Sequence, residues 1–178
     1  MHLKGFEFIM KHFYKIMVVC LCMAMLVPAV GCGSKKEQEG IQDGQAVDMK
    51  ELREAMLAAD TTLPEMKVST SEDEKGELNF TVFSDFDYER VQSYFYAYAA
   101  KGGPQEIAVV ELKEAGDAAA LMNTLQDHIE MREGALGEYA PDQLAMVEHA
   151  VIKQYGRYVA MIIAEKSGLV QQACGDMM

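Results

Sequence analysis

Residues 93–99, SYFYAYA, alternate with a period of two, so that the tyrosines fall on one face of an extended chain and Phe95, Ala97 and Ala99 fall on the other. This alternation predicts a β-strand. The turn residues KGGP at 101–104 separate it from a second predicted strand at 106–113, EIAVVELK, whose apolar centre indicates a position inside a sheet. The two segments together predict a hairpin.

A second hairpin is predicted from strands at 150–154 and 158–164 that meet at Gly156. A two-residue turn, either Tyr155-Gly156 or Gly156-Arg157, keeps the side chains of both strands in one register. Such turns favour positive φ, which glycine adopts without penalty, so we expect positive φ at Gly156. One face of the hairpin then collects Ala150, Ile152, Val159, Met161 and Ile163, and the other collects Val151, Lys153, Ala160 and Ile162.

The helical period of 3.6 residues is clearest at 117–133. Asp117 is expected to cap this helix and Gly134 to end it. The apolar stripe of the helix consists of Ala118, Leu121, Met122, Leu125 and Ile129. We expect this stripe to pack on the apolar face of the sheet.

Three further helices are predicted. The first spans 49–59 and begins with a capping-box pair, Asp48 and Glu51. A proline at the first position suits a short helix at 141–147. An amphipathic tail helix covers about 166–174.

The element order is one helix followed by two hairpin–helix units, which predicts an α+β fold. We expect a two-layer arrangement, in which an antiparallel sheet of about four strands carries its helices on one face. The pattern is weaker at 64–92. There Pro64 breaks the chain, 71–76 is a charged turn, and 78–86 fits either a strand or a short helix.

The N-terminal apolar run Ile16–Val30 contains 15 residues. A helix of that length spans roughly 22 Å, which is short of the ~30 Å hydrocarbon core of a bilayer. A basic head precedes the run and small residues follow it, as in a secretory signal peptide. We therefore predict a signal peptide at 1–31, with Met10 as a second possible start.

The run ends in Ala29-Val30-Gly31-Cys32, which resembles a bacterial lipobox, where a small residue precedes a cysteine that is lipidated and becomes the new N-terminus. Cys20 and Cys22 follow side chains that are too large for this motif. We predict lipidation, such as palmitate, at Cys32, over ordinary secretion or a retained span. Cys174 is then the remaining thiol and is expected to be a small packing residue without a disulfide partner.

Residues 32–46 are polar and contain glycine, which predicts a flexible tether, and 47–178 is expected to form a single domain. The leader carries a net charge of +2 and the whole chain −12, so the 147 residues from Cys32 onward carry −14. This charge disfavours nucleic acid as a partner and repels anionic lipid. The predicted location is the extracytoplasmic face of the cell membrane, with the lipid on Cys32 as the anchor.

No catalytic, cofactor-binding or metal-ligating constellation emerges from the sequence. His128 and His149 lie outside the zinc-binding spacings, and we interpret them as exposed or half-buried histidines. Carboxylates gather at Glu72, Asp73 and Glu74 and again at Asp85 and Asp87, without the spacing of a calcium loop. The serines considered as nucleophiles lack a glycine elbow; they are Ser84, Ser93 and Ser167.

Tyr94, Tyr96 and Tyr98 are predicted to stand in a row on one face of the first hairpin. A row of tyrosines could bind sugar rings, a peptide or a partner surface. The simpler interpretation, which we prefer, is that the row packs under a helix or faces solvent, because tyrosine is a good strand former.

Three segments resemble a family of small bacterial lipoproteins, domain of unknown function four-three-five-eight, which is common in clostridia-type Gram-positive bacteria. They are DMKELREAMLAAD, PQEIAVVELKEAGDAAAL and YAPDQLAMVEHAVIKQYGRYVAMIIAE. The resemblance covers most of 47–174, and its most specific parts are 106–109 and 139–141. It implies a cell-surface lipoprotein of unknown activity and supplies no catalytic residue.

The function that we expect is that of a membrane-anchored binding or interaction module, which binds an unknown protein or envelope ligand and uses no cofactor. The alternative is a small extracytoplasmic enzyme that acts on envelope material through two carboxylates converging in a pocket. A third hypothesis is a structural or assembly subunit, which would form a stable homo-oligomer. The sequence leaves the oligomeric state open.

Overall fold

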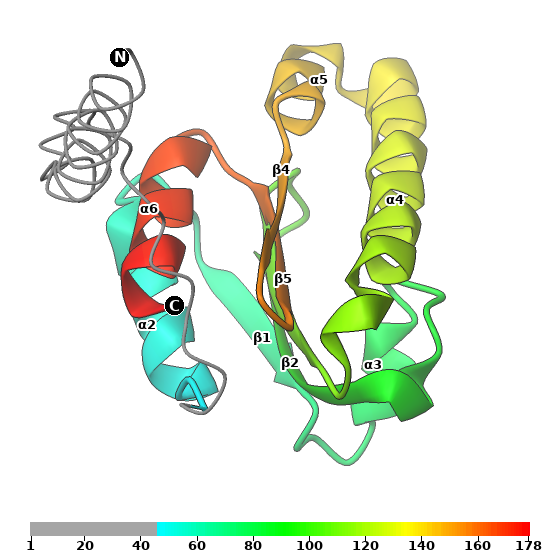
Figure 1. Cartoon of the computed structure of the whole chain (residues 1–178). Coiled ribbons are helices and arrows are strands. Elements are labelled where there is room, and N and C mark those ends of the chain that lie inside the picture. Colours follow the sequence, from blue (N-terminus) through cyan, green and yellow to red (C-terminus); the bar gives the residue numbers. More distant parts are fainter. Residues whose placement is uncertain (1–45) are drawn as a thin grey trace, which may run out of the picture. The chain divides into compact units, whose positions relative to one another are not determined.

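The computed structural model describes residues 46–178 and confirms the α+β class (Figure 1). The helices of this part are α2 (Met49–Ala59), α3 (Gly76–Phe80), α4 (Ala118–Tyr139), α5 (Pro141–Glu148) and α6 (Ser167–Met177). The strands are β1 (Met66–Thr70), β2 (Val91–Ala99), β3 (Glu106–Leu112), β4 (Val151–Tyr155) and β5 (Tyr158–Ile163). The predicted signal peptide, Cys32 and the tether lie outside the described residues.

The five strands form one antiparallel sheet in the order β1-β2-β3-β5-β4. The sequence predicted four of them and missed β1, the edge strand that pairs with β2. Its sequence, MKVST, is short and mostly polar or partly exposed, so it carries no apolar alternation for a pattern to detect. The ambiguous segment 78–86 belongs to α3 and the turns that follow it.

The second hairpin has the predicted register. Tyr155 pairs with Tyr158, so the turn consists of Gly156 and Arg157 alone. Gly156 has a φ of 56°, and no residue other than glycine has positive φ among residues 46–178. Positive φ at only the first turn position is the pattern of a type II′ turn, whose twist matches that of the paired strands.

Helices cover both faces of the sheet, so the two-layer prediction is wrong (Figure 1). One core lies under α3, α4 and α5 and contains Tyr94, Tyr96, Ala108, Val110, Val159, Met161 and Ile163 from the strands. The other lies under α2 and α6 and contains Phe95, Ala97, Ile107, Val109, Ala160 and Ile162. Every residue of β3 and β5 is buried, and a strand that is apolar on both faces needs cover on both sides.

The long helix differs from its prediction at both ends. Asp117 occupies the N-cap position of α4 but makes no capping hydrogen bond, because its carboxylate pairs with Arg90. The helix continues past Gly134, which is exposed and where a Cβ would meet no neighbouring atom within 4 Å, and ends at Tyr139, with Ala140 as its C-cap. A proline disfavours helical backbone at the residue that precedes it, so Pro141 sets the boundary between α4 and α5.

On the other face, α2 and α6 lie side by side (Figure 1). Asp48 caps α2 as predicted, accepting hydrogen bonds from the backbone N–H groups of Lys50 and Glu51. The buried carboxylate of Asp60 follows α2 and accepts from the N–H of Lys166, just before α6. No helix within residues 46–178 has the length and apolar character needed to cross a bilayer.

Candidate functional site

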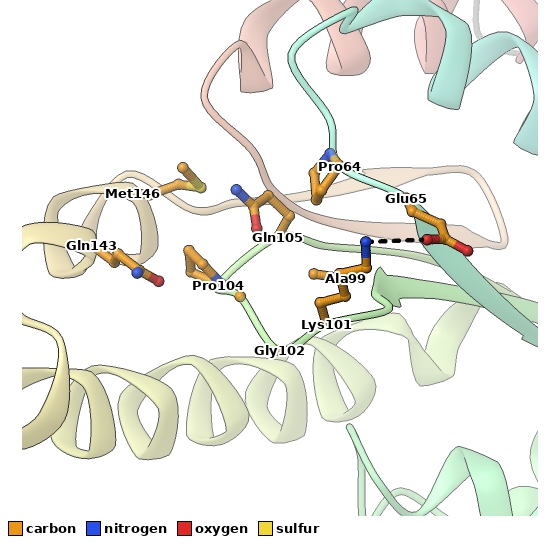
Figure 2. A pocket seen from close by; sticks show the side chains of 10 residues that line it. Pro64, Glu65, Ala99, Lys101, Gly102, Pro104, Gln105, Gln143 and Met146 are labelled. Atoms are coloured by element: carbon orange, nitrogen blue, oxygen red, sulfur yellow. Dashed lines mark ion pairs between the residues drawn. The ribbon is translucent and has the colours of Figure 1, made fainter.

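A groove of about 440 Å³ opens beside the turn between β2 and β3 (Figure 2). Three segments distant in sequence build it: the loop before β1, the β2–β3 turn and α5. The ten residues that line it are Pro64, Glu65, Ala99, Lys101, Gly102, Gly103, Pro104, Gln105, Gln143 and Met146. Its volume lies within the range of about 300–1,000 Å³ that is typical of ligand pockets.

The walls of the groove are mostly uncharged. Figure 2 shows the side chain of Gln105 in the middle, with Gln143 and Met146 of α5 on one side and Pro64 and Glu65 on the other. Glu65 and Lys101 form a loose ion pair of 3.9 Å, and both side chains are largely in solvent. A pair of this kind contributes little to stability. Because both side chains are exposed, their charges remain accessible.

The turn that forms the floor depends on two glycines. Gly102 has a φ of 75°, a conformation that side chains with a Cβ rarely adopt. A Cβ at position 103 would lie 2.5 Å from Oε1 of Gln105, so Gly103 leaves room for the amide of Gln105 against the turn. The carbonyl of Gly103 accepts a 2.9 Å hydrogen bond from Nη2 of Arg132, which ties the turn to α4.

A buried ionic cluster lies directly behind this turn. Glu106, the first residue of β3, places Oε2 2.6 Å from Nε2 of His128 on α4. Its Oε1 lies 2.8 Å from Nε of Arg132, although that N–H does not point at the oxygen, so the contact is ionic rather than a hydrogen bond. One carboxylate thus joins the start of β3 to two successive turns of α4. Arg132 in turn donates a hydrogen bond to the carbonyl of Gly103.

The row of Tyr94, Tyr96 and Tyr98 adjoins this cluster, because Tyr96 lies near Glu106. Burial, and then the charge of Glu106, raise the pKa of the Tyr96 phenol. Tyr96 stacks on Phe83 at 4.5 Å and on Tyr98 at 5.3 Å between ring centroids. Tyr94 is buried and donates a hydrogen bond to the carbonyl of Gly76 on α3. The row therefore packs under helices as expected, and Tyr98 alone of the three is partly exposed.

A second buried carboxylate, Glu111, lies at the other end of β3 and on the opposite face of the sheet. It accepts hydrogen bonds from Ser93 and from the phenol of Tyr158, and it pairs with Arg157 at 2.6 Å. The phenol oxygen of Tyr158 in turn accepts from the N–H of Val47. This network fixes the start of the described chain to the sheet, and all its groups are engaged within the fold.

The two histidines singled out from the sequence have different environments. His149 is exposed, as expected, and its Nδ1 lies 2.6 Å from the carbonyl oxygen of Ala145. For His128 the prediction of an exposed or half-buried side chain is wrong, because it is 7% exposed and paired with Glu106. The apolar stripe of α4 places position 128 next to Ile129, and the carboxylate at the start of β3 provides the partner that makes burial of a histidine favourable.

Asp73 and Asp87 of the acidic clusters and two of the three serines serve local structure, and Ser167 is the first residue of α6. Asp73 accepts from the N–H of Thr70 in the turn after β1, and Asp87 accepts from the N–H of Glu89. Ser84 bonds to Thr124, whereas Ser93 donates to Glu111. Within residues 46–178, no three His, Cys, Asp or Glu side chains gather closely enough to hold a metal ion.

Sequence reasoning missed Glu106, Arg132 and the groove. One signal was present for the first two: His128 and Arg132 follow Leu121 and Leu125 at helical spacing, so two basic residues continue an apolar stripe. Basic side chains on a buried helix face need a buried carboxylate as a partner. The groove had no comparable signal, because its three segments meet only in the tertiary structure.

The alternative hypothesis of an envelope enzyme requires two carboxylates that converge in a pocket. Glu65 is the one carboxylate among the residues that line this groove, and its side chain is 74% exposed. The buried Glu106 and Glu111 lie on opposite faces of the sheet. The two converging carboxylates that this hypothesis requires are therefore not present in this groove.

Comparisons with known proteins identify a family without identifying an activity. The model of the family described as Domain of unknown function (DUF4358) matches residues 67–164, from β1 to the end of β5. No curated protein and no solved structure shows a significant match to the chain. The matched region contains the sheet, except for Met66 at the start of β1, and the β2–β3 turn of the groove.

Proposed function

The chain belongs to the family DUF4358, a domain of unknown function, and from that premise we propose that it is a lipid-anchored binding module on the extracytoplasmic face of the cell membrane. Lipid on Cys32 holds the chain at the membrane, and residues 32–46 form the tether. The groove beside the β2–β3 turn is the binding site.

The anchor is supported by the lipobox-like Ala29-Val30-Gly31-Cys32 after a basic head and a short apolar run. The negative charge of the remaining chain supports a lipid anchor over a basic membrane-binding face, because acidic surfaces are repelled by anionic lipid.

The binding role rests on one observation, the groove of about 440 Å³ lined mostly by uncharged residues from three segments. The ionic cluster of Glu106, His128 and Arg132 supports it, because Arg132 holds the carbonyl of Gly103 and thereby the shape of the groove floor. A preformed site loses less conformational entropy on binding than a mobile one.

The anchor is tested by fatty-acid labelling of intact cells. Cys32→Ala is expected to abolish labelling and to leave uncleaved precursor or released protein. Cys20→Ala and Cys22→Ala are the matched controls and should be labelled like the wild type. Lipid labelling that persists in the Cys32→Ala variant would refute the anchor.

The binding role is tested by photo-crosslinking on intact cells. A photo-reactive amino acid replaces Lys101 on the rim of the groove, and in a matched control it replaces Lys113, an exposed lysine after the other end of β3. We expect a crosslinked product of one defined mass from position 101 and none of that mass from position 113. The same product should disappear when Met146→Glu is added, because a charge then occupies the apolar wall. Equal products from both positions, or none from position 101, would contradict binding at the groove.

A further inference from the structure

The chemistry of the groove narrows the class of its ligand. Of the ten lining residues, Glu65 and Lys101 carry charges of opposite sign and lie 3.9 Å apart. The other eight are uncharged. A ligand that enters this groove therefore meets no net charge, and a strongly charged ligand would lose hydration without gaining a net counter-charge.

Two side-chain amides supply the hydrogen-bonding groups of the groove. Among the described glutamines, Gln126 bonds to Glu130 and Gln154 to the carbonyl of Gly156, whereas the amides of Gln92, Gln171 and Gln172 form no hydrogen bond within the fold. The amides of Gln105 and Gln143 both face the groove (Figure 2), and no hydrogen bond to any other side chain that the structure describes engages them. Each amide offers donors and an acceptor, the same pair of groups that a peptide unit presents.

Apolar surface flanks these amides. Pro64 and Pro104 present rigid rings, and Met146 presents a flexible thioether that adapts to different side-chain shapes. The alternation of amide groups with apolar surface matches a polypeptide, in which backbone amides alternate with side chains.

Two other ligand classes fit less well. Sugar-binding sites rely on aromatic rings, and none of the ten lining residues is aromatic. A phosphate or another anion needs convergent positive charge, whereas the single cation at this groove is already opposite a carboxylate.

We infer that the groove binds an uncharged segment of polypeptide in an extended conformation, an inference that rests on the binding function proposed above. An extended segment leaves its N–H and C=O groups free, whereas a helix uses them internally. Gln105 and Gln143 bond to the backbone of the segment, and Pro64, Pro104 and Met146 contact its side chains.

The test uses the full chain purified in detergent and a panel of short synthetic peptides. Each peptide has an acetylated N-terminus, an amidated C-terminus, a few uncharged residues and one terminal Trp. Because the protein contains no Trp, the Trp fluorescence reports the peptide alone. Chitotriose, an oligosaccharide, is added as a competitor, and peptides with several Lys or Glu residues are compared with the uncharged ones.

At least one uncharged peptide is expected to bind saturably, with little dependence on salt and no displacement by chitotriose. Gln105→Ala and Gln143→Ala should each weaken its affinity roughly 3- to 10-fold, which corresponds to the loss of one hydrogen bond. Gln172→Ala removes an exposed glutamine of α6 and should leave the affinity unchanged. Circular dichroism of each variant establishes that it is folded.

The inference is overturned if no uncharged peptide binds, if charged peptides bind in a strongly salt-dependent way instead, or if chitotriose displaces the peptide. It is also overturned if binding is indifferent to both glutamine substitutions in folded variants. These failures differ from failure of the proposed function. A crosslink at position 101 that persists while every peptide fails would leave the binding module intact and refute only the peptide ligand.

Discussion

Nε2 of His128 on α4 lies 2.6 Å from Oε2 of Glu106 on β3, and both side chains are buried. The same carboxylate faces Nε of Arg132 at 2.8 Å. Arg132 also donates to the carbonyl of Gly103, so the pair is part of a chain of contacts that ends at the groove. The relationship therefore links the packing of α4 to the shape of the candidate binding site.

Glu106→Ala is expected to destabilise the fold by about 3–5 kcal/mol, because it leaves basic side chains in a buried place without their partner. Urea unfolding measures the change. Glu114→Ala removes an exposed carboxylate close to the end of β3 and should change stability by less than about 0.5 kcal/mol. A loss below about 1 kcal/mol for Glu106→Ala would contradict a buried ionic contact.

Leu125→Ala is expected to lower the free energy of unfolding by about 2–5 kcal/mol, because Leu125 is fully buried between α4 and the sheet. That is a large part of the ~5–15 kcal/mol that a typical fold holds. Leu169→Ala is the matched control, because Leu169 on α6 is 49% exposed. If the two substitutions had equal effects on the unfolding midpoint, the assignment of the inner face of α4 would be wrong.

Gly156→Val should destabilise the fold by at least about 1 kcal/mol, because a β-branched residue is strained at positive φ. No neighbouring atom lies within 4 Å of a Cβ built there, so the loss reports backbone strain and not a clash. Gly156→Asn should lose less, because asparagine adopts positive φ more readily than a β-branched residue does. Thermal unfolding of the two variants compares them directly, and equal losses would argue against strain as the cause.

Asp60 makes stability depend on pH in a defined direction. Burial opposes its ionisation, but hydrogen bonds from Thr62 and Lys166 outweigh burial and lower the pKa of the carboxyl below its ordinary value of 3.8. The native state therefore binds this proton less readily than the unfolded state does. Its stabilising contribution is complete above that ordinary value and is lost as the pH falls through the lowered one.

Asp60→Asn removes this titration while keeping a similar shape. We expect the wild type to lose more stability than the variant between about pH 6 and about pH 3, measured as the free energy of unfolding in urea at each pH. Asp127→Asn, at an exposed position on α4, is the control and should follow the wild type. Parallel pH profiles for the wild type and Asp60→Asn would show that Asp60 is not the titrating group.

Cys174 is expected to be inert towards thiol reagents. It is fully buried, and burial raises the pKa of its thiol to about 12, although a hydrogen bond involving Tyr155 acts in the opposite direction.

In a chain that begins at Ala46, Cys174 is the single cysteine. This shorter chain should be soluble and folded, and iodoacetamide should modify it at least about 100-fold more slowly than after unfolding in urea, because the thiolate is the reactive form. Equal rates would mean that α6 does not pack as described.

Local sequence patterns determined much of this fold. The alternation at 93–99 and the register around Gly156 assigned each side chain to a face, and the structure has the same assignment. The stripe through Leu121 and Leu125 identified the buried face of α4. These predictions hold because a strand or a helix places neighbouring side chains by its own geometry, without reference to the rest of the chain.

Only the tertiary structure decided which elements meet. β1 became a strand because β2 offered it a free edge, and α6 came to the opposite face from α4 because β3 and β5 are apolar on both faces. Arg132 continues the apolar stripe of α4, but its pairing with Glu106 arises only where β3 begins beneath α4. The groove likewise unites Pro64, Gln105 and Met146, which no short-range pattern connects. The sequence by itself therefore determined the faces of the elements, and long-range packing decided the layers, the buried cluster and the candidate site, because those depend on contacts between residues far apart in the chain.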